Sequence, residues 1–380
     1  MYMSFYRTLL AASLLASAPA LWTASSAENQ PTQGEPDGTL HIHELTIPPS
    51  SYWSPEFTKA YAKMVAEMRA AVEPQLDPHP ARTAPKAEWD KFYTDQERGL
   101  SEPLQWDLKH YPVDVVDTKI AGVHVGIITP KDGVAPENRR RVLIDLHGGG
   151  FVDFSGLSFG QLESIPVASL GKIKVVTVDY RQSPYYKYPA ASEDVEAVYK
   201  HLLKQYKPEA IGIFGCSAGG FLTAQVVSWF QAKALPRPGA VGIFCAGIPG
   251  ADKSGDSAIW GLGIMPESPP KAGTAQASPV SSAVHWYMEG VDEHDLKAFP
   301  GTSDRLLAKF PPTLFVAGTR TADGSWAVTG HARLLKLRVD SYLYLMEGGT
   351  HASYVFFSNT PESRDTNAYI ARWFNQHLAR

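Results

Sequence analysis

Residues 211–220 read IGIFGCSAGG, and they contain the most informative motif of the chain. An apolar run typical of a buried strand ends in a Gly-x-Ser-x-Gly turn, and residues 221–227 continue with a helical pattern. A strand–turn–helix of this kind is so tight that Ser217 must adopt a strained backbone conformation. Only glycines at 215 and 219 leave room for the neighbouring strand and helix. We therefore interpret Ser217 as an exposed nucleophile rather than as part of an ordinary glycine–serine loop.

Short runs rich in Val, Ile, Leu and Phe alternate with helical patterns on both sides of this turn. Such runs are typical of strands buried on both faces, and their alternation with helices predicts an α/β fold with a mostly parallel, doubly wound sheet of eight strands. Ligands bind such sheets at the carboxyl ends of the strands. We expect an antiparallel pair at 113–118 and 123–128, and further strands at 141–146, 173–178, 211–214, 240–244, 313–317 and 341–345. We expect helices over 158–170, 189–206, 218–233, 325–338 and 362–378.

Two helical patterns precede the first strand. One opens with Ser54 as an N-cap, and the other covers about 85–98. Each has an apolar stripe that must pack against something formed later in the chain. We expect residues 51–110 to form an N-terminal helical cap over the Ser217 site.

The main domain is expected to cover residues 111–380. Its strand–helix alternation is interrupted over 246–310 by a segment rich in Gly, Pro and Ser. We interpret this segment as an insertion that carries one helix, at about 283–297, and contributes further walls of the cap.

The first residues, 1–27, have the order of a secretory signal peptide. Arg7 precedes an apolar stretch, and small residues follow as far as Ala27. The apolar stretch is short for a membrane span, so we expect cleavage near Glu28, export to the periplasm or medium, and no stable membrane insertion of the mature protein. An uncleaved anchor is the alternative. Residues 28–50, rich in Pro, Gly, Thr and Gln, are expected to form a flexible arm.

Composition and motif spacing exclude several classes of partner. The net charge of −4 and the pI near 6.3 indicate no basic surface for nucleic acid or an anionic membrane. No group of His, Cys and carboxylate residues has metal-ligand spacing, and no phosphate-binding glycine loop is present, so we expect no metal and no cofactor. Cys216 and Cys245 are either buried apolar residues or a disulfide; the sequence leaves this choice and the oligomeric state open.

A serine nucleophile needs hydrogen-bond donors for the oxyanion that develops during attack. Residues 143–151 read LIDLHGGGF and place three glycines directly after a strand. Their N–H groups can approach a substrate carbonyl closely, and together with the N–H of Ala218 they would form an oxyanion hole. His147 is interpreted as a hydrogen-bonding strut of this loop and not as a base.

The serine also needs a base, and the base needs an acid that orients it. His351 lies in a loop just after the last predicted strand, where the base is expected. Asp323 is the only acidic residue between the strand at 313–317 and the helix that follows it. We expect Asp323 to accept from Nδ1–H of His351, to fix its tautomer and to stabilise the imidazolium.

Taken together, these motifs resemble those of bacterial hormone-sensitive-lipase-like esterases, which have the α/β-hydrolase fold. The similarity runs from about Pro112 to the carboxyl terminus. It implies ester hydrolysis without a cofactor, a cap of N-terminal helices, and oxyanion donors at the second and third glycines, here Gly149 and Gly150, together with Ala218. The motifs that carry it are HGGGF at 147–151, VDYR and SP within 178–184, YPAA and ED within 188–194, GCSAGG at 215–220, FPPT at 310–313 and GTR at 318–320.

Two positions depart from the family pattern. Cys216 occupies a position that is usually acidic in the family, which changes the local charge but removes no catalytic group. Family members often read Gly-Thr-Arg-Asp with the aspartate as the acid, whereas this chain has Thr321 there and an aspartate two residues later. Either the loop is rearranged so that Asp323 reaches His351, or the acid is missing. We expect the rearrangement.

The sequence as a whole predicts a serine carboxylic-ester hydrolase that acts on small, fairly apolar acyl esters through an acyl-enzyme. One alternative is a ligand-binding protein on the same fold with impaired catalysis, for which Thr321 is the only support. Another is a peptidase or acyltransferase that uses the same three residues, although the glycine loop after His147 favours esters.

Overall fold

The computed structural model describes residues 33–34, 40–41, 46–70, 79–250, 257 and 286–379. The chain divides into two units, Met1–Pro48 and Pro49–Arg380. In the first unit, β1 (Gln33–Gly34) pairs with β2 (Leu40–His41) in an antiparallel arrangement. The predicted signal peptide lies outside the described residues, so it stays a prediction, as does the flexible arm.

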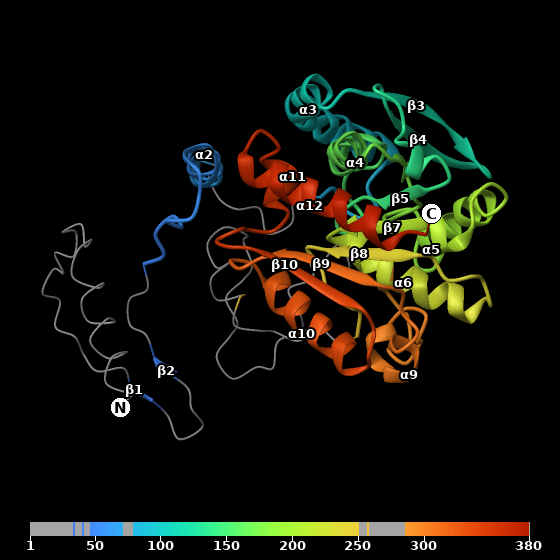
Figure 1. The fold of residues 1–380 in the computed structure, drawn as a ribbon. Helices are drawn as coiled ribbons and strands as arrows, with labels where there is room; N and C mark the ends of the chain where they lie inside the picture. Colours follow the sequence, from blue (N-terminus) through green and yellow to red (C-terminus); the bar gives the residue numbers. More distant parts are fainter. Residues whose placement is uncertain are drawn as a thin grey trace, which may run out of the picture. The chain divides into compact units, whose positions relative to one another are not determined.

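The second unit is built on one sheet of eight strands in the order β10-β9-β8-β7-β5-β6-β4-β3 (Figure 1). Strands β5 to β10 pair in parallel, while β4 pairs antiparallel with both β3 and β6. The mostly parallel eight-stranded sheet predicted from the sequence is therefore confirmed. The strands are β3 (Val113–Ile120), β4 (Val123–Pro130), β5 (Val142–Leu146), β6 (Lys174–Val178), β7 (Ile211–Cys216), β8 (Ala240–Phe244), β9 (Thr313–Gly318) and β10 (Ser341–Met346).

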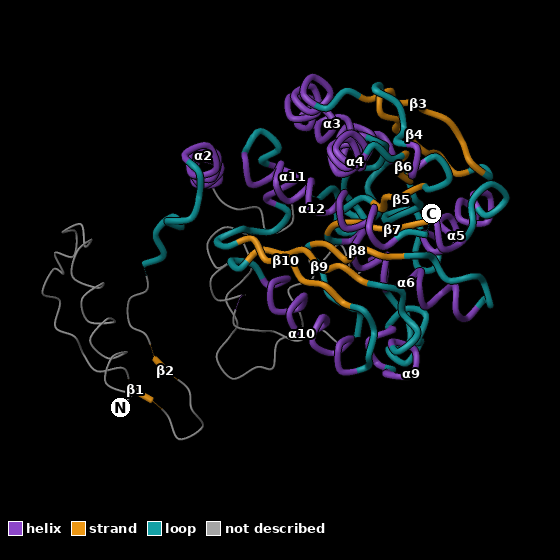
Figure 2. The backbone as a smooth tube through the Cα atoms, in the orientation of Figure 1, coloured by secondary structure: helices purple, strands orange, loops and turns teal. Residues whose placement is uncertain are grey.

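Helices cover both faces of this sheet (Figure 2). The central strands β5, β7, β8 and β9 are buried along their whole length, which explains why their sequences are continuous apolar runs. One face packs against α4 (Ser158–Gly171) and α12 (Pro361–His377), and the other packs against α5 (Ala190–Leu202), α6 (Ala218–Ala232) and α10 (Ala322–Lys336). The shorter elements are η1 (Pro136–Asn138), η2 (Pro208–Ala210), η3 (Pro300–Thr302), α9 (Asp304–Leu307) and α11 (Ser353–Phe356).

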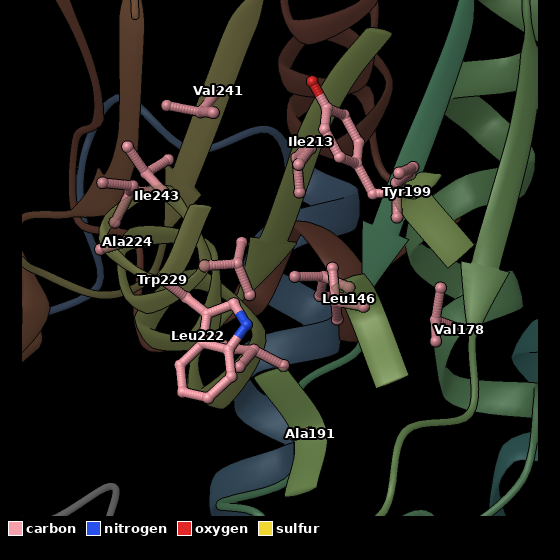
Figure 3. Close-up of a cluster of buried hydrophobic side chains, with 14 of the residues drawn as sticks. Leu146, Val178, Ala191, Tyr199, Ile213, Leu222, Ala224, Trp229, Val241 and Ile243 are labelled. Carbon is pink, nitrogen blue, oxygen red and sulfur yellow. The ribbon is translucent and has the colours of Figure 1, made fainter. Parts of the chain in front are cut away.

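Figure 3 shows part of the core on the α5–α6 face of the sheet. Leu146 and Ile213, from the adjacent strands β5 and β7, lie in one cluster with Leu222 and Trp229 of α6. Each of these four side chains is at most 5% exposed. The strands that carry the glycine loop and the Ser217 turn are thus anchored in the same packed layer just before they end.

The helices before the sheet are α2 (Pro55–Ala70) and α3 (Lys86–His110). The predicted N-cap is confirmed, because Ser54 Oγ accepts a hydrogen bond from the N–H of Phe57 at 3.1 Å. The predicted end near Arg98 was wrong, since α3 continues through Pro103 to His110. Packing of its second half against α4, with Leu100 buried, outweighs the loss of one backbone hydrogen bond at the proline. Within the described ranges, no helix combines the length and apolar character needed to span a bilayer.

The helix predicted at about 283–297 falls partly outside the described residues and is wrong beyond Met288, where turns begin. Gly290 has a left-handed backbone with φ of 79°. The carboxylates of Asp292 and Asp295 accept hydrogen bonds from backbone N–H groups two residues later, at 2.9 and 3.0 Å. Such local side-chain contacts compete with helical hydrogen bonds, which explains why the helical pattern is not realised here.

One histidine joins the antiparallel edge of the sheet to the end of β6. His124 lies between Asp117 and Asp179, with each ring nitrogen 2.8 Å from a carboxylate oxygen. Burial by itself would lower the pKa of His124, but the hydrogen bonds and charges of Asp179 and Asp117 outweigh it and raise the pKa above its ordinary value. The protonated form is therefore favoured by folding.

We predict that this histidine makes the stability pH-dependent. A folded-state pKa above the unfolded value gives stability that is fully present below about pH 6.5 and is lost as the pH rises through the folded pKa of His124. The side chain is 35% exposed, so water screens the pairs and the effect is at most about 1 kcal/mol. Urea unfolding should show that the free energy of unfolding falls more between pH 5.5 and pH 9 in the wild type than in His124→Gln. Equal losses in the two proteins would contradict this account.

Candidate active site

Ser217 is held in a strained turn between β7 and α6. Its backbone has φ of 58° and ψ of −120°, a conformation that residues other than glycine rarely adopt. A Cβ atom on Gly215 would lie 2.1 Å from the carbonyl oxygen of Leu146, and one on Gly219 would lie 1.6 Å from the same atom. Both glycines are therefore required by the direct approach of the turn to the end of β5. The resulting turn leaves Ser217 partly exposed.

The structure brings the serine, the histidine and the aspartate singled out from the sequence into one line. His351 follows β10 in a loop that leads to α11, and its Nε2 lies 2.9 Å from Ser217 Oγ. Its Nδ1 lies 3.1 Å from Asp323 Oδ1. When Nδ1 carries the ring hydrogen that points to Asp323, Nε2 is free to accept the hydroxyl hydrogen of Ser217. Asp323 is 1% exposed, whereas the side chain of His351 is 25% exposed.

The acid loop has the rearranged form that the sequence suggested. Asp323 lies in the first turn of α10, and this helix begins at Ala322, three residues earlier than predicted. Thr321 is the N-cap residue, and its hydroxyl donates to the same Asp323 oxygen that faces His351. The comparison with the family pattern does not predict this role of Thr321. A threonine followed by an acid in the first turn is a helix-start signal, which could have identified both the helix boundary and this contact.

The glycine loop after β5 lies beside the serine turn. Gly149 and Gly150 have φ of 114° and 60°, and a Cβ on Gly149 would lie 2.6 Å from the backbone oxygen of Asp153. Among the described residues, no acceptor is bonded to the N–H of either glycine or of Ala218, the first residue of α6. The three predicted donors are thus free of protein partners in the described part of the chain.

His147 is buried beneath the surface and contacts the first glycine of this loop. The residue is 1% exposed, its ring stacks on Tyr180 at 4.3 Å, and its Nδ1 lies 2.6 Å from the carbonyl oxygen of Gly148. The Tyr180 hydroxyl in turn donates to the backbone oxygen of His147 at 2.6 Å. Burial lowers the pKa of His147, which favours the neutral ring. These contacts agree with the interpretation of His147 as a strut.

Residues before and within α3 contact the far end of the glycine loop. The Asp153 carboxylate accepts from Gln96 at 2.6 Å and lies 3.1 Å from His79 Nε2, and the Gln96 side-chain oxygen accepts from the N–H of Phe154 at 2.9 Å. An aromatic cluster packs around the buried Val152 and contains Trp89, Phe92, Tyr93 and Trp286. These contacts place part of the 51–110 segment against the loop, while its role as a cap over Ser217 stays a prediction.

Both cysteines are free and buried, so the structure contains the thiol form rather than the disulfide. Burial raises the pKa of Cys216, which disfavours its thiolate. Within the described residues, no group of three or more His, Cys, Asp or Glu side chains could hold a metal ion.

A model of the alpha/beta hydrolase fold family matches residues 143–355, which is more than half of the chain. The chain belongs to this family. Among solved structures, this α/β-hydrolase is similar to esterase E25, with 30% identity and a TM-score of 0.73 over 90% of this chain and 99% of that one. Its fold is also similar to that of an esterase from the bacterial hormone-sensitive lipase family, with 22% identity and a TM-score of 0.68 over 86% and 99% of the two chains. The resemblance stated from the sequence is thereby confirmed.

Curated relatives match over shorter segments. Arylacetamide deacetylase of Oryctolagus cuniculus is 36% identical over 122 residues, which is 30% of this chain and 30% of that protein. Across such relatives, the chain spans between 30% and 66% of their own length.

We predict a graded response to changes at the acid loop. Asp323→Asn should slow the labelling of Ser217 by a fluorophosphonate by up to about 10⁴-fold, because an amide cannot stabilise the imidazolium of His351. Thr321→Val should slow it about tenfold, since it removes one hydrogen bond to a charged carboxylate. Labelling can be followed by intact-protein mass spectrometry.

Thr319→Val is the matched control for these two variants. Thr319 lies in the same loop, but its hydroxyl contacts Glu347 and the N–H of Gly348 rather than Asp323. Its labelling rate should stay near that of wild type. If Asp323→Asn is labelled at the wild-type rate, Asp323 does not orient His351.

Proposed function

We propose that this protein is a serine carboxylic-ester hydrolase that acts on small, fairly apolar acyl esters. The observation that carries the proposal is the line of contacts Ser217 Oγ to His351 Nε2 at 2.9 Å and His351 Nδ1 to Asp323 at 3.1 Å. A serine nucleophile requires such an alignment with a base and an acid, and burial of Asp323 strengthens its effect on the histidine.

In the first half of the reaction, Ser217 Oγ attacks the ester carbonyl while His351 Nε2 takes the hydroxyl proton. The carbonyl electrons move to oxygen, and the N–H groups of Gly149, Gly150 and Ala218 stabilise this oxyanion. Asp323 stabilises the imidazolium formed on His351. Collapse of the tetrahedral adduct breaks the bond to the alcohol oxygen, which leaves as the alcohol after receiving the proton from His351.

In the second half, water releases the acyl group. His351 takes a proton from water as its oxygen attacks the acyl-enzyme, and returns it to Ser217 Oγ as the carboxylic acid departs. Every proton-transfer step uses a group of the chain or water.

The test is hydrolysis of p-nitrophenyl esters of graded acyl length, beginning with acetate and butyrate. We expect turnover that decreases for long acyl chains and is lost in Ser217→Ala, because the nucleophile is absent. Ser303→Ala provides a matched serine control, since it removes only the N-cap of α9 and should keep wild-type turnover. If wild type and Ser217→Ala hydrolyse every ester at the same background rate, the proposed esterase function is wrong.

A further inference from the structure

A buried glutamate joins the two segments that carry the proposed oxyanion donors. Glu163 belongs to α4 and is 3% exposed. Its Oε1 accepts a hydrogen bond from the N–H of Gly148 at 2.9 Å, and its Oε2 accepts one from the N–H of Cys216 at 3.1 Å. One carboxylate therefore binds the first glycine of the loop after β5 and the last residue of β7.

The two bonded N–H groups lie one or two residues before the proposed oxyanion donors in the sequence. Gly148 precedes Gly149 and Gly150, and Cys216 is separated from Ala218 only by Ser217. The pairing of β5 with β7 ends at Leu146 opposite Gly215. Beyond that point β5 and β7 no longer pair, and the Glu163 carboxyl group connects the two segments that follow them.

Burying the Glu163 carboxyl group beside a second carboxyl group, that of Asp145, costs free energy. Burial raises the pKa of Glu163 well above its ordinary value, and the neighbouring Asp145 carboxyl raises it further, while the N–H groups of Gly148 and Cys216 act in the opposite direction. Asp145 is also buried, accepts from the Thr177 hydroxyl at 2.7 Å and interacts with the Glu163 carboxyl itself. An apolar side chain at 163 would avoid the burial of a carboxyl group, but it would leave two buried N–H groups without acceptors.

We propose that Glu163 is a positioning residue that sets the spacing between the glycine loop and the serine turn, and so aligns the donors of the oxyanion hole. The inference rests on the proposed hydrolase function.

A positioning role of this kind acts on the transition state. Donors must lie about 2.7–3.1 Å from the oxyanion, and this charge develops only when Ser217 attacks. Misplaced donors therefore lower kcat while leaving ground-state binding, and with it KM, nearly unchanged. A residue that serves only the stability of the fold would lower the melting temperature but not kcat per intact site.

The decisive variant is Glu163→Gln, which keeps the shape of the side chain. Its carbonyl oxygen can accept from one N–H group, but its amide nitrogen cannot accept from the other, so one of the two bonds is lost. We expect kcat for p-nitrophenyl butyrate, corrected for sites titrated by a fluorophosphonate, to fall about 10- to 100-fold. This fall is smaller than the one expected when an oxyanion donor is removed altogether. KM should change less than about twofold. The affinity for a trifluoromethyl ketone, whose Ser217 adduct carries an oxyanion, should fall in parallel with kcat/KM.

Asp145→Asn is the matched control, because Asp145 interacts with the Glu163 carboxyl but does not bond the N–H of Gly148 or of Cys216, so both bonds of Glu163 stay in place. It should keep kcat within about twofold of wild type. Glu163→Asp is the second variant, for use if Glu163→Gln does not fold. It keeps the carboxylate but is one methylene too short to reach both N–H groups, and it should lower kcat with KM unchanged.

The outcomes separate this inference from the proposed function. Wild-type kcat in folded Glu163→Gln or Glu163→Asp overturns the inference and leaves the esterase function intact. The same holds if Asp145→Asn loses as much kcat as Glu163→Gln, or if the loss lies wholly in KM. An inert wild-type protein overturns both.

Discussion

The contact between the Ser217 turn and the end of β5 is the constraint on which the rest of the site depends. The carbonyl oxygen of Leu146 lies so close to the turn that neither Gly215 nor Gly219 can carry a Cβ atom. Because β5 and β7 are neighbours in the sheet, this contact holds the strained serine beside the first residues of the glycine loop. The position of Ser217 is thus set first by backbone packing between the turn and β5.

Two buried carboxyl groups then complete the site from outside the serine turn. Asp323 reaches His351 from the first turn of α10, where Thr321 donates to it. Glu163 reaches the backbone of Gly148 and Cys216 from α4. In both cases a side chain on a rigid helix orients groups on loops, which is the arrangement that holds an active site with least freedom.

The sheet was largely predictable, because strands buried on both faces leave continuous apolar runs that need no knowledge of their partners. The predicted helix ends were less accurate. Packing on α4 extends α3 to His110, and local carboxylate contacts at Asp292 and Asp295 replace a helix beyond Met288. Side-chain periodicity reports what a segment could bury, whereas its boundaries depend on what lies against it.

The order of the motifs along the chain was enough to predict that a serine turn, a glycine loop and a histidine after the last strand would meet at one edge of a parallel sheet, because chain order and strand direction bring the carboxyl ends of the strands together. The folded chain was needed to show that Asp323 faces His351 despite its shifted position, and that Glu163 bridges Gly148 and Cys216. Those contacts join residues far apart in the chain within hydrogen-bond distance, and a difference of about 1 Å, invisible in a sequence pattern, separates a bond from none.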